Sequence, residues 1–454
     1  MKLKSLFIVS LLAGAVISSF NSCKPELNEL TFSNNGVDFS KYVAIGNSLT
    51  AGYMDGALYL QGQENSYPSI LARQFSFVGG GEFKQPLFNS SIGFAINTDP
   101  MIRFDSRYIL GFKNSCTGAT SLSPVLFAAS ADSTFFNYIG AQGPYNNMGV
   151  PGMKSFDLDS AEFGSPFLNV GNSFYSRFAT SPDNSTVLSD AKRQLPTFFT
   201  FSLGANDVLG YALAGGDALI DKITTKIIFE NNINPALASL AENGTKGAVA
   251  NIPSVVDIPY FNTIPYNALV LTQEQADQLN FTYAASNPPI SFVAGNNALV
   301  IKDLNASPDF KRQLKPTELV LLSLPLDSVY CEGWGSNSLK PLEDKFVLTE
   351  NEIREINNAT TQFNGILQSQ ATLLDLAYVD LNAFFKSTQG GLVFNGVTFT
   401  PEFVSGGAFS LDGVHPNAKG YALIANEYIK AINNKYGCRI PLADVNAYSG
   451  NVFP

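Results

Sequence analysis

Residues 42–53 read YVAIGNSLTAGY, and the fold class that the sequence predicts depends first on this stretch. An apolar run with β-branched Val43 and Ile45 that reaches a glycine-containing turn is typical of a buried strand meeting a loop. Ser48 follows the carboxyl end of that strand, the edge where open α/β sheets bind ligands. The same position also suits the N-cap of a helix, because a serine hydroxyl accepts a hydrogen bond from the first turn. From this stretch alone, Ser48 is a candidate for either role.

Three more segments have the character of buried strands that end at turns. Helical patterns accompany them: one over 66–75, one opened by a capping box of Thr349 and Glu352, and a last one that stops at Gly437. Strands that alternate with helices predict a mainly parallel sheet with helices on both faces, a three-layer α/β/α sandwich. The three further strand segments are 197–204, 247–253 and 377–381.

Residues 262–346 interrupt this alternation. The segment is rich in proline and has no sustained period, yet pieces such as ELVLLSLPL (318–326) are too apolar to remain in water. We therefore predict a large insertion, a lid or small subdomain, within a domain spanning 41–437, followed by a C-terminal tail over 438–454. A second irregular stretch, 83–145, is rich in Phe, Ser and Asn and is expected to form long loops.

Composition excludes some partners. The chain has 454 residues, 45% of them apolar, which is enough to bury a sizeable core. Its formal net charge is −10, so it repels phosphate backbones and nucleic-acid binding is not expected. The same charge argues against electrostatic binding to anionic lipid headgroups.

The N-terminus has the pattern of a targeting segment. A short basic start, MKLKS, precedes the apolar run LFIVSLLAGAVI, which is short for a spanning helix but suits a signal sequence. The segment 1–22 followed by Cys23 resembles a bacterial lipoprotein signal, in which the cysteine is acylated; ordinary secretion with cleavage nearby is the alternative. We expect 23–40 to be a tether, the protein to be an exported, membrane-anchored lipoprotein of the cell envelope, and that lipid anchor to be its contact with the membrane.

The remaining cysteines agree with export. Cys116, Cys331 and Cys438 form no CxxC pair and lack zinc-type spacing. An oxidising compartment would permit one disulfide and leave one thiol. The sequence does not say which two residues pair, and three free buried thiols are an alternative.

Two other short motifs carry polar groups or glycines that a site could use. Asn206 follows a strand that ends at Gly204, so its amide could donate into the same crevice as Ser48. Gly152 lies in a turn-rich loop, where the absence of a Cβ lets a backbone N–H approach a ligand. Turn formation is the simpler explanation for each of them alone.

The segment SLDGVHPNAK (410–419) contains the only histidine of the chain. Asp412 precedes His415 by three residues, a spacing that lets a carboxylate reach the imidazole within a compact loop and leaves the other ring nitrogen to act as a base. A helix-capping segment with an incidental histidine is the alternative. One histidine with no nearby cysteine does not make the usual transition-metal sites, so no metal is expected.

In order along the chain, these motifs resemble the SGNH hydrolases, also called GDSL esterases and lipases. The resemblance covers roughly 41–260 and 347–437 and omits the insertion. One position departs from the pattern, because Asn47 replaces the aspartate of the first block, which is not the triad acid. The matching blocks are Gly46-Asn47-Ser48-Leu49, Asn147 to Gly152, Gly204-Ala205-Asn206-Asp207 and Asp412-Gly413-Val414-His415-Pro416.

The resemblance implies a serine esterase or acylhydrolase that works without a cofactor. Ser48 would be the nucleophile, His415 the base and Asp412 the acid of the triad, with an acyl-enzyme intermediate. The oxyanion would be held by the N–H groups of Ser48 and Gly152 and by the amide of Asn206. The substrates would be small-molecule or polymer esters, of lipids or of acylated carbohydrates. The alternative is a catalytically retired lipoprotein that binds glycans or lipids.

Overall fold

The computed structural model describes residues 31–97, 103–166 and 171–454. The chain divides into two units, residues 1–32 and 33–454, and all the elements below belong to the second. The predicted signal segment over 1–22 and the predicted acylation site at Cys23 lie outside the described residues.

A five-stranded parallel sheet lies at the centre of the fold, in the order β15-β8-β7-β1-β6. β1 and β7 are buried along their whole length, as parallel strands covered on both faces must be. The strand prediction is confirmed at four positions, and β6 is the fifth strand, which the sequence analysis had taken for part of a glycine loop. The strands are β1 (Tyr42–Gly46), β6 (Asn147–Gly149), β7 (Phe198–Ser202), β8 (Lys246–Ala250) and β15 (Ala377–Val379).

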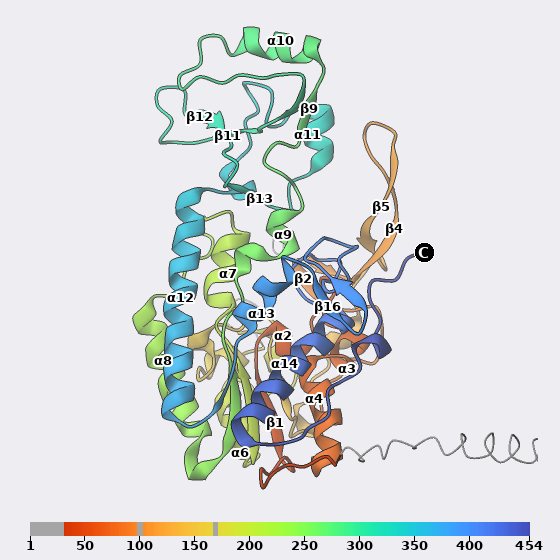
Figure 1. Cartoon of the computed structure of the whole chain (residues 1–454), viewed down its shortest axis with the longest axis vertical. Coiled ribbons are helices and arrows are strands. Elements are labelled where there is room, and N and C mark those ends of the chain that lie inside the picture. The colour runs from red at the N-terminus through yellow and green to blue at the C-terminus, as the bar shows by residue number, and fades with distance from the viewer. Residues whose placement is uncertain (1–30, 98–102, 167–170) are drawn as a thin grey trace, which may run out of the picture. The chain divides into compact units, whose positions relative to one another are not determined.

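Helices cover both faces of the sheet, so the predicted three-layer α/β/α architecture is confirmed (Figure 1). On one face α4 (Tyr67–Phe75) packs against α14 (Ala418–Tyr436), and on the other α8 (Lys226–Leu240) packs against α12 (Glu350–Leu373). The expected caps are present: the N–H of Thr349 donates to Glu352 Oε2 at 2.7 Å, and Gly437 ends α14 with a φ of 68°. Smaller elements are α3 (Leu60–Glu64), α6 (Val187–Arg193), α13 (Leu381–Thr388), β16 (Leu392–Phe394) and β17 (Val397–Phe399).

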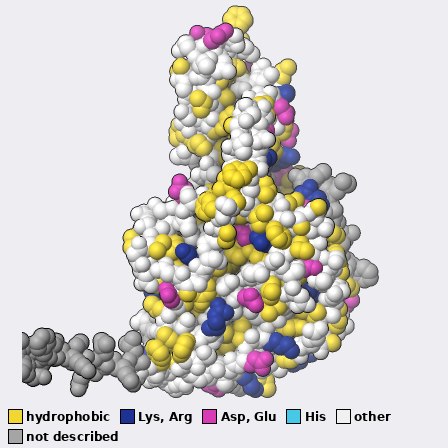
Figure 2. All heavy atoms as spheres, turned by 90° about the vertical axis from the view of Figure 1, so that its right-hand side faces the viewer, with side chains coloured by type: hydrophobic (Ala, Val, Ile, Leu, Met, Phe, Trp, Pro, Cys, Tyr) yellow, Lys and Arg dark blue, Asp and Glu magenta, His cyan; other side chains and the backbone are white. Residues whose placement is uncertain are grey.

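The stretch 83–145 corrects an expectation, because it contains two β-hairpins where long loops were predicted. The larger hairpin pairs β4 (Tyr108–Asn114) with β5 (Thr120–Leu126) over seven residues each. Its strands are mostly half-buried or exposed, so they lack the apolar alternation by which a half-buried strand is found in a sequence. Apolar side chains gather on this face of the molecule (Figure 2). The exposed apolar side chains on the larger hairpin and just after it include Phe112, Leu126 and Phe127. The smaller hairpin pairs β2 (Ala95–Asn97) with β3 (Arg103–Asp105).

The insertion has a hydrophobic core of its own, formed by buried residues between positions 264 and 347. A disulfide joins Cys331 of this segment to Cys116 at the tip of the β4–β5 hairpin, while Cys438 is a free, buried thiol. The pairing that the sequence left open is therefore 116 with 331. The elements are α9 (Pro259–Asn262), β9 (Leu269–Leu271), α10 (Gln273–Thr282), β10 (Gly295–Asn297), β11 (Val300–Lys302), β12 (Lys311–Gln313), β13 (Leu319–Val320), α11 (Leu326–Glu332) and β14 (Val347–Leu348).

The packed chain extends beyond 41–437 at both ends. Val37 and Phe39 are buried in the main core, although the predicted tether reaches residue 40. Ile440 and Val445, in the predicted C-terminal tail, are buried in the same core. Within the described residues, no helix combines the length and the apolar character needed to cross a membrane.

Candidate active site

Three neighbouring strands end at the same edge of the sheet and deliver the predicted site residues there. Gly46 of β1 pairs with Gly149 of β6 on one side and with Ser202 of β7 on the other. Ser48 begins the short helix α2 (Ser48–Ala51) directly after β1, and Asn206 begins α7 (Asn206–Leu213) after β7. The carboxyl edge of the sheet, where α/β proteins bind ligands, therefore carries these residues.

The helix cap next to Ser48 is Asn47, so the N-cap role that the sequence left open for Ser48 is excluded. The side-chain oxygen of Asn47 accepts a hydrogen bond from the N–H of Leu49 at 3.1 Å. Ser48 is thus the first helical residue, and its hydroxyl is not used as a cap. Asparagine at position 47 supplies the same type of acceptor that an aspartate would supply.

His415 bridges Ser48 and Asp412. Its Nε2 atom lies 2.8 Å from Ser48 Oγ, and its Nδ1 atom lies 2.8 Å from Asp412 Oδ2. A carboxylate only accepts hydrogen bonds, so Nδ1 carries a proton; in the neutral ring Nε2 is then the acceptor for the serine hydroxyl. The ring of Tyr53 lies against the imidazole, with centroids 4.8 Å apart.

Asp412 is held by donors on both carboxylate oxygens. Oδ1 accepts from the N–H groups of Val414 and His415, each at 2.8 Å, and from the hydroxyl of Ser410 at 3.1 Å. Oδ2 accepts from the N–H of Gly56 at 3.0 Å and from the imidazole. Burial acts to raise the pKa of Asp412, but the neighbouring His415 and these hydrogen bonds outweigh it, so the pKa lies below the ordinary value. The residue is therefore ionised at neutral pH.

The predicted oxyanion donors belong to segments that follow β1, β6 and β7 at the same edge of the sheet. Gly152 has a φ of 84°, a conformation that favours glycine. Within residues 31–97, 103–166 and 171–454, the N–H groups of Ser48 and Gly152 have no hydrogen-bond acceptor. The amide of Asn206 donates to the carbonyl of Met153 at 3.0 Å, which holds it beside the Gly152 loop. An amide nitrogen has two N–H bonds, so one more is free for a ligand.

Hydrogen bonds from two other segments fix the loop that carries Gly152. Asp207, next to Asn206, is fully buried and accepts from the N–H of Ser155 at 2.9 Å and from its hydroxyl at 2.6 Å. Burial raises the pKa of Asp207, although the bonds to Ser155 oppose the shift. On the other side, the amide of Asn172 donates to the carbonyl of Pro151 at 2.8 Å.

The sequence analysis missed Gly56, Ser410 and Asn172. Gly56 follows Asp55 in a turn-type pair, and Ser410 stands two residues before Asp412. Both are therefore recognisable as turn residues, but nothing in the sequence says that their hydrogen bonds go to Asp412. Asn172 has no such signal, because its contact depends on how two distant loops meet.

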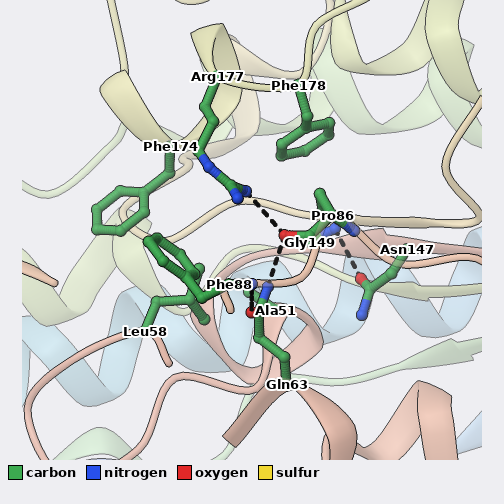
Figure 3. A pocket seen from close by; sticks show the side chains of 10 residues that line it. All are labelled: Ala51, Leu58, Gln63, Pro86, Phe88, Asn147, Gly149, Phe174, Arg177 and Phe178. Carbon is green, nitrogen blue, oxygen red and sulfur yellow. Dashed lines mark hydrogen bonds between the residues drawn. The ribbon is translucent and has the colours of Figure 1, made fainter. Parts of the chain in front are cut away.

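A small cavity lies behind α2 and is lined mostly by apolar side chains, including Phe88, Phe174 and Phe178 (Figure 3). Its volume is about 10 Å³, which is room for one water molecule, so it is not a substrate pocket. Arg177 points into this region and donates to the carbonyls of Pro86 and Leu87, each at 2.8 Å. Burial lowers its pKa to about 10. We assign this arginine a structural role.

The model of the GDSL-like lipase/acylhydrolase family matches residues 42–428. The chain belongs to this family. A solved structure from Parabacteroides merdae, provisionally described as a GDSL-like lipase, matches over 87% of this chain and 97% of that chain, with 12% identity and a TM-score of 0.31. No curated protein matches the sequence.

As a GDSL-like lipase/acylhydrolase, the protein is an ester-bond hydrolase. The family match spans every strand of the central sheet and all the predicted site residues from Ser48 to His415. In the part of the chain that the structure describes, no three His, Cys, Asp or Glu side chains form a group that could hold a metal ion.

Proposed function

We propose that this hydrolase cleaves carboxylic esters with Ser48 as nucleophile, His415 as general base and acid, and Asp412 as the acid of the triad. The observation that carries the proposal is the pair of 2.8 Å contacts that link Asp412, His415 and Ser48 in a line. A serine hydroxyl needs an adjacent base to become a nucleophile, and the base in turn needs a partner that orients it.

In the acylation step, Ser48 Oγ attacks the ester carbonyl carbon while its proton moves to His415 Nε2. Asp412 stabilises the imidazolium that forms and keeps the Nδ1 proton in place. The tetrahedral intermediate then collapses: the bond to the alcohol oxygen breaks, the imidazolium gives its proton to that oxygen, and an acyl-serine remains.

In the deacylation step, water attacks the acyl-serine and His415 takes the proton of the water. The second tetrahedral intermediate expels Ser48, which regains a proton from the imidazolium, and the carboxylic acid leaves. In both steps the negative oxygen would be held by the N–H groups of Ser48 and Gly152 and by the amide of Asn206.

We propose lipid esters or acylated carbohydrates as the substrate class. The β4–β5 hairpin supports an apolar or sugar-bearing substrate, because it begins beside the site and carries the 74% exposed Phe112. Tyr108, at the base of the hairpin, lies against Gly56, which donates to Asp412. An exposed aromatic ring can receive an acyl chain or stack on a sugar.

The test is an ester panel: p-nitrophenyl esters from acetyl to long acyl chains, a phospholipid and an acetylated sugar, each with Ser48→Ala as the blank. We expect turnover of at least one class by the native enzyme and none by Ser48→Ala with the same circular dichroism spectrum. Full activity in Ser48→Ala would end the serine mechanism, and failure of the native enzyme on every ester would end the proposed substrate class.

We further propose that the protein is exported and anchored to the cell envelope through acylated Cys23. The signal-like sequence supports this, and so does the disulfide between Cys116 and Cys331, because disulfides persist in oxidising compartments. Expression in a bacterial host with an alkyne-labelled fatty acid tests it. Label is expected in the native chain and not in Cys23→Ala, and equal labelling of both would contradict the proposal.

A further inference from the structure

Asp55 is a buried carboxylate in the turn after the nucleophile helix, with 8% of its surface exposed. Its φ of 55° is left-handed, so the backbone is held there by its surroundings. Burial raises the pKa of this carboxyl, and the hydrogen bond from Tyr59 opposes that shift. The family match and the proposed triad give this residue no role.

Every polar group of Asp55 has a partner. Oδ1 accepts from the N–H of Leu411 at 3.1 Å, and Oδ2 accepts from the hydroxyl of Tyr59 at 2.6 Å. The backbone N–H donates to Ser410 Oγ at 3.0 Å, and the carbonyl accepts from the N–H of Tyr108 at 2.8 Å. Asp55 thus ties the turn after the nucleophile helix to the loop that carries Asp412 and to the β4–β5 hairpin.

Two of these links continue directly to the triad acid. Gly56, the next residue, donates its N–H to Asp412 Oδ2 at 3.0 Å, the same oxygen that receives the imidazole. Ser410, which accepts from the Asp55 N–H, donates its hydroxyl to Asp412 Oδ1 at 3.1 Å. The backbone of Asp55 therefore contacts or carries a donor for each oxygen of Asp412, and its side chain fixes that backbone through Tyr59 and through Leu411, the residue between Ser410 and Asp412.

We propose that Asp55 is a positioning residue for the reaction: it holds the Gly56 N–H and the Ser410 hydroxyl on the carboxylate of Asp412, and through that carboxylate it sets the orientation of His415. The proposal rests on the triad proposed above. Within the described residues Asp55 makes no hydrogen bond to Ser48 or to the imidazole, so it acts through these neighbours.

The variant Asp55→Ala removes both side-chain acceptors. Misplacement of a triad by about 1 Å costs up to about 10²-fold in rate, so we expect kcat to fall about 10- to 100-fold while KM changes less than about twofold. Asp55→Asn keeps one carbonyl acceptor for Leu411 and can donate to the Tyr59 oxygen, so it should recover most of the lost kcat.

The chain offers a matched control in Asp190. This carboxylate is also buried and accepts from a tyrosine hydroxyl (Tyr175, 2.9 Å), a backbone N–H (Thr180, 2.8 Å) and a serine hydroxyl (Ser185, 3.1 Å). Asp190→Ala should lower the thermal midpoint to a similar degree as Asp55→Ala. Its kcat, counted per active site titrated with a fluorophosphonate, should stay within about twofold of native.

The single histidine supplies a second readout. Because His415 is the only histidine, its Nδ1 proton gives one resonance in the ¹⁵N-histidine-labelled protein. Asp55→Ala should shift or broaden that resonance, while Asp55→Asn and Asp190→Ala should leave it in place. Ser410→Ala serves if Asp55→Ala does not fold, because it removes one link of the same path; it should move the resonance and lower kcat about threefold or more.

An unchanged resonance with native kcat in Asp55→Ala, or in folded Ser410→Ala, would overturn the positioning role. Equal losses of kcat per titrated site in Asp55→Ala and Asp190→Ala would also overturn it, since the effect would then be general loss of stability. These outcomes differ from failure of the triad itself, which would appear as full activity in Ser48→Ala.

Discussion

His415 Nε2 lies 2.8 Å from Ser48 Oγ, although the two residues are 367 positions apart in the chain. Ser48 arrives at this point from the first strand of the sheet, and His415 arrives from the loop before the last helix, α14. The contact therefore joins residues near the two ends of the family domain. Substitution of either residue tests its chemistry.

Removal of the imidazole should be nearly as damaging as removal of the serine hydroxyl. In His415→Ala the proton of Ser48 has no base to move to, so hydrolysis of a short p-nitrophenyl ester should fall about 10³-fold or more. Diethyl pyrocarbonate should inactivate the native enzyme through a single modified imidazole. Turnover that survives complete modification would contradict the role of His415 as base.

Asp412→Asn should keep the fold and lose most of the activity. An asparagine would place an N–H₂ group against the donors that now bind the carboxylate. It would also no longer favour the tautomer of His415 with the proton on Nδ1. In a triad, the loss of the acid costs about 10⁴-fold in kcat. Circular dichroism and active-site titration separate a lost fold from a lost reaction. A variant with more than about a tenth of native kcat would rule out the assigned role.

Asn206→Ala should lower kcat about 10²- to 10³-fold with a small change in KM, because an oxyanion donor acts on charge that exists only in the transition state. Asn232→Ala, at a half-buried position of α8, is the matched control, since it also removes an amide that donates to a backbone carbonyl. Equal kcat in the two variants would remove Asn206 from the oxyanion hole.

The disulfide should contribute strongly to stability. Cys116 and Cys331 are 215 residues apart, and closing such a loop stabilises the fold by about 5 kcal/mol in the chain-entropy model, with 2–4 kcal/mol the usual measured range. Cys116→Ser, Cys331→Ser and the reduced native protein should all unfold at the same lower temperature. A midpoint that does not respond to reductant would show that the bond does not form.

Asp157→Asn should change the pH dependence of stability. Burial raises the pKa of Asp157 from 3.8 to about 6, so the folded state binds its proton more tightly than the unfolded state does. The stability from this group is fully present below about pH 4 and is lost as pH rises through about 6. Relative to native, Asp157→Asn should therefore be more stable at pH 8 than at pH 4. A difference that does not vary with pH would contradict this shift.

The sequence alone was enough to predict the fold class and the motifs that form the candidate site. The strand at 42–46 is a continuous apolar run, the caps at Thr349 and Gly437 mark helix ends, and the four motifs stand in family order. The strand and the caps are local signals. They can be recognised in a sequence because burial and capping impose patterns on residues that are close together in the chain. The β4–β5 hairpin lacks such a local signal, because its exposed faces leave little apolar alternation. The sequence analysis therefore missed it.

The sequence by itself therefore determined the parallel α/β sheet and the residues from Ser48 to His415 that form the candidate triad. Only the tertiary structure decided that Cys116 pairs with Cys331, that Asn47 rather than Ser48 caps α2, and that Gly56 and Ser410 hold the carboxylate of Asp412. The physical reason is distance along the chain. Gly56 and Asp412 are 356 positions apart, and the direction of an N–H bond toward a distant carboxylate depends on how two turns pack, which no local pattern encodes.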